Sequence, residues 1–159
     1  MKKIGSIIIS SIIIGSLFIL GMVHAQDGFQ PEPCQDSKIH AELVTLNESF
    51  HSQGFSIAHF NVITIPHKTF VPVMVNMKQG KVYQLNFIAA RDFHKYDVVL
   101  VDKDKNEIVK MKAKGKSSEG HHFSQSITPP YTGNYWVIIS QNVKGNDRSC
   151  IGFSLLEGK

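Results

Sequence analysis

The chain has 159 residues, with 17 Lys and Arg against 13 Asp and Glu, a formal charge of +4, two cysteines and 42% hydrophobic residues. Lys2, Lys3 and many apolar residues lie in the first 25 positions, so a chain without them has a charge of +2 and the length of one ordinary domain. These values exclude a large multidomain enzyme, a multi-span membrane protein and a disordered chain, and they argue against nucleic acid as a partner.

Residues 1–25 are typical of a secretory signal peptide. Two lysines precede an apolar stretch over 4–23, and Val23-His24-Ala25 provides a cleavage site after Ala25. The alternative is a retained anchor, because the stretch approaches the roughly 20 residues that span a bilayer. Serines and glycines within the stretch favour cleavage. We therefore expect a secreted or periplasmic protein that is not an integral membrane protein after cleavage.

Export affects how the two cysteines are interpreted. In an oxidising compartment an even pair most simply forms one disulfide, here between Cys34 and Cys150. The alternative, a reactive thiol, is disfavoured because the sequence has no CxxC motif and no cysteine left over. The sequence therefore predicts a bridge that closes nearly the whole domain.

An extended leader and one helix open the mature chain. Residues 26–36 contain Gly, two Pro and few apolar side chains, which predicts an extended leader before a single domain at 37–159. Asp36 or Ser37 can cap the helix that follows, and Gly54 ends it. Apolar residues at helical spacing predict one core-facing stripe. The stripe consists of Ile39, Leu43, Leu46 and Phe50.

From residue 55 onward the apolar period changes from helical to two, which predicts strands. The first strand would place Phe55, Ile57, His59, Asn61, Ile63 and Ile65 on one face. Short strands separated by close turns are typical of an all-β antiparallel β-sandwich of jelly-roll type. The eight expected strands lie at 55–65, 71–77, 83–87, 96–101, 107–111, 123–127, 135–140 and 150–156.

Three features follow in order between residues 80 and 156. Gly80-Lys81-Val82-Tyr83 leads a strand, 97–106 gives a D-x-x-L-x-D hairpin, and 131–138 carries a tG-x-Y-x-v-x-v strand. This order resembles the bacterial pre-peptidase C-terminal domain and related jelly-roll sandwiches of exported proteins. The resemblance implies a non-catalytic module, with carbohydrate or calcium binding in some relatives.

Asp102, Asp104 and Asn106 form a candidate calcium loop, because alternate oxygen-bearing side chains can converge on one ion. However, Glu107 and Ala113 occupy the positions where an EF-hand needs glycine and glutamate. A solvated hairpin turn is therefore the favoured interpretation.

Lys110, Lys112, Lys114 and Lys116 alternate along one expected strand and so project from one side. Such lysines can protect an edge strand from pairing with another chain. They can also form a stripe for an anionic partner, such as an acidic polysaccharide or lipid headgroups. The first interpretation is favoured and the second is kept. The partners considered for the module are an envelope protein or a polysaccharide.

The histidines show no HxH or HExxH spacing, so the sequence predicts no metal site. His121 and His122 are expected on opposite faces of a strand, which would prevent them from chelating one ion. Asp92 and His94 are expected to share a face, as an ordinary charge pair.

Aromatic side chains offer a candidate sugar-binding face, but the strand at 135–140 is apolar on both sides, so core packing is expected for it. The four candidates are Tyr96, Tyr131, Tyr135 and Trp136.

We expect no catalytic residues and no cofactor. The protein is expected to be an exported, non-catalytic module with a binding or structural role. The alternatives are a carbohydrate- or calcium-binding jelly roll and a small metal-dependent hydrolase that uses Asp92, His94 or the histidine pair.

Overall fold

The computed structural model describes residues 31–114 and 120–159, which contain one helix and eight strands. The helix α1 spans Ser37–His51. The strands are β1 (Phe55–Pro66), β2 (Val71–Met77), β3 (Tyr83–Ile88), β4 (Phe93–Val101), β5 (Glu107–Lys114), β6 (His122–Ile127), β7 (Gly133–Val143) and β8 (Arg148–Gly158). The predicted signal peptide at 1–25 lies outside the described residues.

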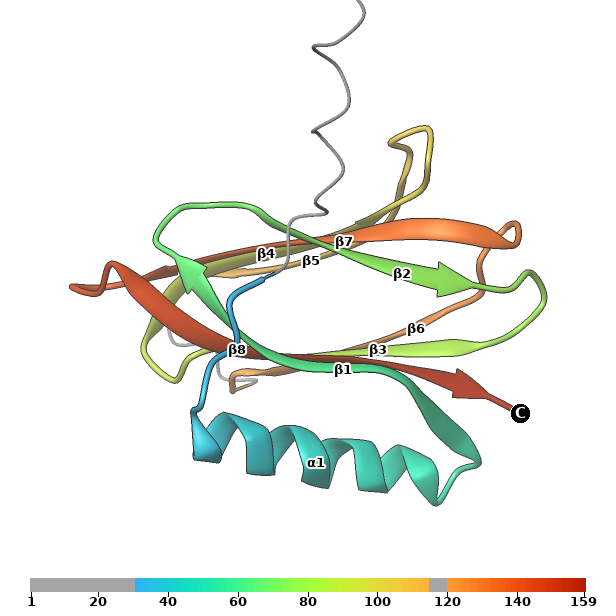
Figure 1. Cartoon of the computed structure of the whole chain (residues 1–159), viewed down its shortest axis with the longest axis horizontal. Coiled ribbons are helices and arrows are strands. Elements are labelled where there is room, and N and C mark those ends of the chain that lie inside the picture. Colours follow the sequence, from blue (N-terminus) through green and yellow to red (C-terminus); the bar gives the residue numbers. More distant parts are fainter. Residues whose placement is uncertain (1–30, 115–119) are drawn as a thin grey trace, which may run out of the picture. The chain divides into compact units, whose positions relative to one another are not determined.

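The strands form two four-stranded antiparallel sheets, and this confirms the predicted sandwich. The first sheet has the order β1-β8-β3-β6, and the second has the order β2-β7-β4-β5. Figure 1 shows the two sheets as stacked layers, with α1 on the outer side of the first sheet. Consecutive strands therefore often lie in different sheets, so most contacts join distant parts of the sequence.

The main core lies between the sheets. Strand β7 buries alternate residues, and Tyr135, Val137 and Ile139 point inward with no exposed surface. Strand β3 is buried at all six positions because the second sheet covers one of its faces and α1 the other. Large side chains from both sheets fill the interior; they include Tyr83, Phe87, Leu85, Leu100, Ile151 and Phe153.

Helix α1 begins where its cap was expected. The Asp36 carboxylate accepts hydrogen bonds from the backbone N–H groups of Lys38 and Ile39, at 2.9 and 3.1 Å. Ile39 and Leu43 then pack on Ile88 of β3. The helix approaches the sheet closely because Gly152 has no side chain: a Cβ there would lie 3.0 Å from Ile39 Cγ2.

Cys34 and Cys150 form the predicted disulfide, with 5.9 Å between their Cα atoms and a sequence separation of 116. The described part of the leader runs beside β1. The Cys34 N–H donates to the Val62 carbonyl at 2.9 Å, and the Thr64 N–H donates to the Glu32 carbonyl at 2.7 Å. The bridge therefore ties the leader to β8, a strand of the first sheet.

The start of β1 differs from the expected alternation. A shift in pairing between Ile57 and His59 interrupts the ladder with β8, and Ile57 is 58% exposed. The single-face prediction is wrong there because the bulge changes which side each residue faces. Ile63 and Ile65, beyond the bulge, are buried as predicted.

No helix among the described residues is long and apolar enough to cross a membrane.

Candidate functional site

The outer face of the second sheet carries an exposed tryptophan. In the antiparallel ladders, Trp136 of β7 lies opposite Met74 of β2 on one side and Val101 of β4 on the other. Directly paired residues share a sheet face, so these three side chains form one row. Trp136 is 39% exposed and Met74 is 52% exposed. We call this surface the tryptophan face.

This exposure corrects the expectation that the whole β7 strand packs in the core. Strand β7 is central in its sheet, as predicted, but only one of its faces is covered. Tyr135 and Tyr96 are buried, and Tyr131 is partly buried. The apolar character of both faces could not distinguish a covered outer face from an exposed one.

The predicted lysine stripe lies on the same face. Lys110 pairs in register with Val99, Lys112 with Asp97, and Lys114 with Lys95. The register of β4 with β7 continues these rows to residues on the tryptophan side of β7. The structure thus places the stripe next to apolar and aromatic surface. Lys116 lies outside the described residues.

Acidic side chains neutralise only part of this charge. Lys110 Nζ lies 2.7 Å from Glu107, and this contact raises the pKa of Lys110. Asp97 contacts both Lys95, at 2.6 Å, and Lys112, at 3.6 Å. Among the described residues, none forms an ion pair with Lys114. The stripe therefore keeps a positive balance.

A hollow of about 180 Å³ opens on the tryptophan face. Ser140 and Asn142 of β7 offer hydroxyl and amide groups there, and Phe70, which is 63% exposed, stands at the rim. The remaining lining residues are Lys68, Lys95 and Asp97. The hollow combines cationic, hydrogen-bonding and aromatic groups. Phe70 and Met74 were not predicted as site residues, although an aromatic residue beside a turn lysine is a signal visible in the sequence.

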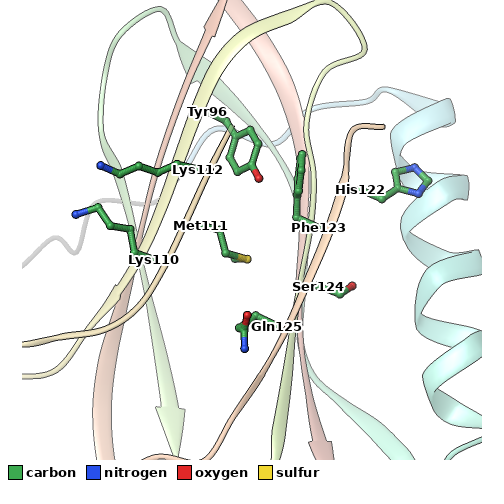
Figure 2. A pocket seen from close by; sticks show the side chains of 8 residues that line it. All are labelled: Tyr96, Lys110, Met111, Lys112, His122, Phe123, Ser124 and Gln125. Carbon is green, nitrogen blue, oxygen red and sulfur yellow. The ribbon is translucent and has the colours of Figure 1, made fainter. Parts of the chain in front are cut away.

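A larger cleft, of about 440 Å³, lies between the edge strands β5 and β6. Figure 2 shows Tyr96 and Met111 pointing toward β6, whereas the ammonium groups of Lys110 and Lys112 point the other way. Ser124 and Gln125 line the opposite wall. Lys110 and Lys112 also line this cleft, but their ammonium groups lie on the side away from β6.

The candidate calcium residues form the turn between β4 and β5. Asp102 is buried, and its carboxylate accepts hydrogen bonds from the backbone N–H groups of Asp104 and Asn106 and from the Asn106 amide, at 2.8–2.9 Å. Burial raises the pKa of Asp102, but these hydrogen bonds outweigh it and the pKa is lowered. Asp104 and Asn106 are exposed. In the structure Asp102 therefore serves the turn itself.

A cluster of Glu42, His121 and His122 was not foreseen. His121 Nε2 lies 2.6 Å and His122 Nε2 lies 2.8 Å from Glu42 Oε2. The prediction that the histidines face opposite ways is wrong because β6 begins at His122, so His121 precedes the strand and is free of its alternation. Only the fold could bring α1 to this point, since Glu42 is 79 residues away from His121.

The Glu42 carboxylate stays ionised in this setting. Burial alone would raise its pKa, but hydrogen bonds from His122, His121 and Arg91 have the larger effect and lower the pKa to about 2.

Asp92 does not pair with His94: Asp92 lies in the turn before β4 and contacts Asn146 at 3.5 Å. The predicted Asp92–His94 pair is therefore wrong.

Comparison with protein-family models and with curated proteins gives no match. Among solved structures, an arabinose-bound α-L-arabinofuranosidase aligns over 62% of this chain at 10% identity, with a TM-score of 0.36. The infectious bursal disease virus Gt strain aligns over 65% at 9% identity, with the same TM-score. The aligned regions cover 19% and 31% of those chains.

Proposed function

We propose that this protein is an exported, non-catalytic β-sandwich module that binds an acidic polysaccharide through the tryptophan face. The observation that carries the proposal is the ladder register, which puts exposed Trp136 on the same face as the lysine stripe. Export is supported by the apolar N-terminal segment and by a disulfide, which persists in oxidising compartments.

The chemistry of the face matches such a polymer. An exposed aromatic ring can stack on the C–H face of a sugar, and lysine ammonium groups can pair with its carboxylates. Trp136 supplies the ring, and Lys110 and Lys112 supply cations two strands away. The hollow beside Ser140 and Asn142 adds hydrogen-bonding groups for hydroxyls.

The face can contact more than one sugar ring. Phe70 lies four residues from Met74 in sequence, which corresponds to roughly 13 Å of extended chain at about 3.3 Å per residue. Phe70 and Trp136 thus provide two separated aromatic platforms on the same sheet. This spacing favours a chain of sugars over a single monosaccharide.

Affinity measurements with an acidic polysaccharide, a neutral glucan and duplex DNA test the proposal. We expect the acidic polysaccharide to bind, the neutral glucan to bind weakly, and added salt to reduce binding because it screens exposed charges. Lys110→Glu combined with Lys112→Glu should reduce affinity at least tenfold, and Trp136→Ala should reduce it to a similar extent.

The matched control is Lys38→Glu combined with Lys159→Glu, which changes net charge equally but lies away from the second sheet. It should retain binding. Failure of the folded protein to bind acidic polysaccharides contradicts the proposal. Equal binding of DNA that is insensitive to Trp136→Ala contradicts it too, because that result describes a general polyanion surface.

A further inference from the structure

Three potential metal ligands meet where α1 approaches the start of β6. Glu42 comes from α1, and His121 and His122 come from the first residues after the undescribed 115–119 segment and Gly120. Their ligand atoms all lie within 4.8 Å of one another. The two imidazole rings have centroids 4.3 Å apart, and both Nε2 atoms point at the same carboxylate oxygen.

This donor set suits zinc. Two imidazole nitrogens and one carboxylate oxygen are ligands that zinc takes at about 2.0–2.2 Å, with a water in an open fourth position. Tetrahedral bonds of that length place ligand atoms about 3.3 Å apart, so the present 2.6 and 2.8 Å separations need an opening of roughly half an ångström. Calcium and magnesium prefer oxygen-rich sites, so one carboxylate with two imidazoles selects against them.

The surroundings of the cluster leave room for that fourth ligand. The side chains of Glu42 and His121 are 18% and 16% exposed, whereas His122 is 44% exposed. The His121 carbonyl accepts a hydrogen bond from the Ala89 N–H at 2.9 Å, which anchors this end of the segment to the first sheet. The ligands are thus held by the backbone but open to solvent on one side.

Arg91 carries a positive charge beside the cluster and therefore opposes a cation there. Its guanidinium contacts Glu42 Oε1, the carboxylate oxygen that the histidines leave open. The Arg91 side chain is 67% exposed and can therefore move away at small cost. Its positive charge should weaken metal binding without preventing it, and this provides a specific test.

We propose that Glu42, His121 and His122 bind a zinc ion that links α1 to the first sheet. The site is on the helix side of the molecule and does not depend on the proposed polysaccharide function of the second sheet. Bonds from the three side chains to the ion would replace the hydrogen bonds among them and stabilise the docking of α1 on the first sheet.

Calorimetry with zinc chloride and tag-free, chelator-treated protein tests the site. We expect one zinc per chain, a raised Tm with zinc, and no comparable effect of calcium or magnesium. His121→Asn and His122→Asn should each weaken zinc binding at least tenfold, and the two together should abolish it. His94→Asn, at an exposed histidine of β4, is the matched control and should bind like the parent.

Arg91→Gln should tighten zinc binding several-fold, because it removes the opposing charge while the protein keeps all three ligands. Cobalt(II) in place of zinc should give the strong visible absorption of a four-coordinate site, and His121→Asn should remove it. Far-UV circular dichroism establishes that each variant is folded. Zinc binding that is absent from the folded parent, or that survives the double histidine substitution, overturns the proposal.

Discussion

Ser154 of β8 donates a 2.6 Å hydrogen bond to Asn47 of α1, and both side chains are buried. The same Asn47 Oδ1 accepts a second bond from the Asn86 amide of β3 at 3.1 Å. Asn86 Oδ1 in turn accepts from Ser124 of β6 at 2.8 Å. This polar row crosses the first sheet under the helix and fixes where along the sheet α1 can dock.

Replacing Asn47 should therefore destabilise the fold. Asn47→Ala leaves two buried donors without their acceptor, and each such loss costs about 1–3 kcal/mol. We expect the free energy of unfolding to fall by about 2–4 kcal/mol, measured by urea denaturation. Glu48→Ala, at the exposed neighbouring helix position, should change it by less than about 0.5 kcal/mol. Equal effects of the two substitutions would contradict the structural role of the row.

Gly152→Ala tests the close approach of the helix to the sheet. The added methyl would meet Ile39 Cγ2 at 3.0 Å and Leu43 Cδ2 at 3.3 Å, so α1 or its side chains must move. We expect a loss of about 1–3 kcal/mol, the usual cost of overpacking. Ile39→Ala should relieve part of it, so the double variant should be more stable than the sum of the two losses implies. Strictly additive losses would place the strain elsewhere.

Local patterns predicted the elements but not which surfaces are covered. Alternation, together with a continuous apolar run at 96–101, located all eight strands, and Asp36 was one of two residues expected at the helix start. These features depend on neighbouring residues. The exposure of Trp136 depends on what lies over the second sheet. The meeting of Glu42 with His121 depends on how α1 folds back across the first sheet. Both depend on long-range packing, to which sequence periodicity is insensitive.

Acidification should destabilise the protein through His59. Burial lowers the pKa of His59 below its ordinary 6.5, and the neutral ring accepts a 2.8 Å hydrogen bond from the Asn61 amide. Below pH 6.5 the unfolded chain takes up a proton that the folded chain resists, so stability present above that pH falls as pH decreases. Urea unfolding at pH 7.5 and 5.5 should show a smaller loss for His59→Gln than for the parent. The same loss in both proteins would assign the effect to other groups.

The Cys34–Cys150 bridge should contribute a large part of the stability. It closes a loop between cysteines that are 116 positions apart in sequence, for which chain entropy predicts about 4–5 kcal/mol. Cys34→Ser combined with Cys150→Ser should reduce the free energy of unfolding by that amount. A reducing agent should destabilise the parent to the same level and leave the double variant unchanged. A parent protein insensitive to reduction would show that the bridge does not constrain the unfolded chain.

Trp136 is the only tryptophan in the chain, so its fluorescence reports directly on the proposed binding face. Because Trp136 is 39% exposed, acrylamide should quench its fluorescence readily in the free protein. An acidic polysaccharide that stacks on the ring should shift its emission to shorter wavelength and protect it from quenching. Lys110→Glu with Lys112→Glu leaves the indole in place but weakens attraction of the polymer, so the shift should need far more ligand. Binding without any change at Trp136 would place the polysaccharide on another surface, and the cleft between β5 and β6 would then be the next to test.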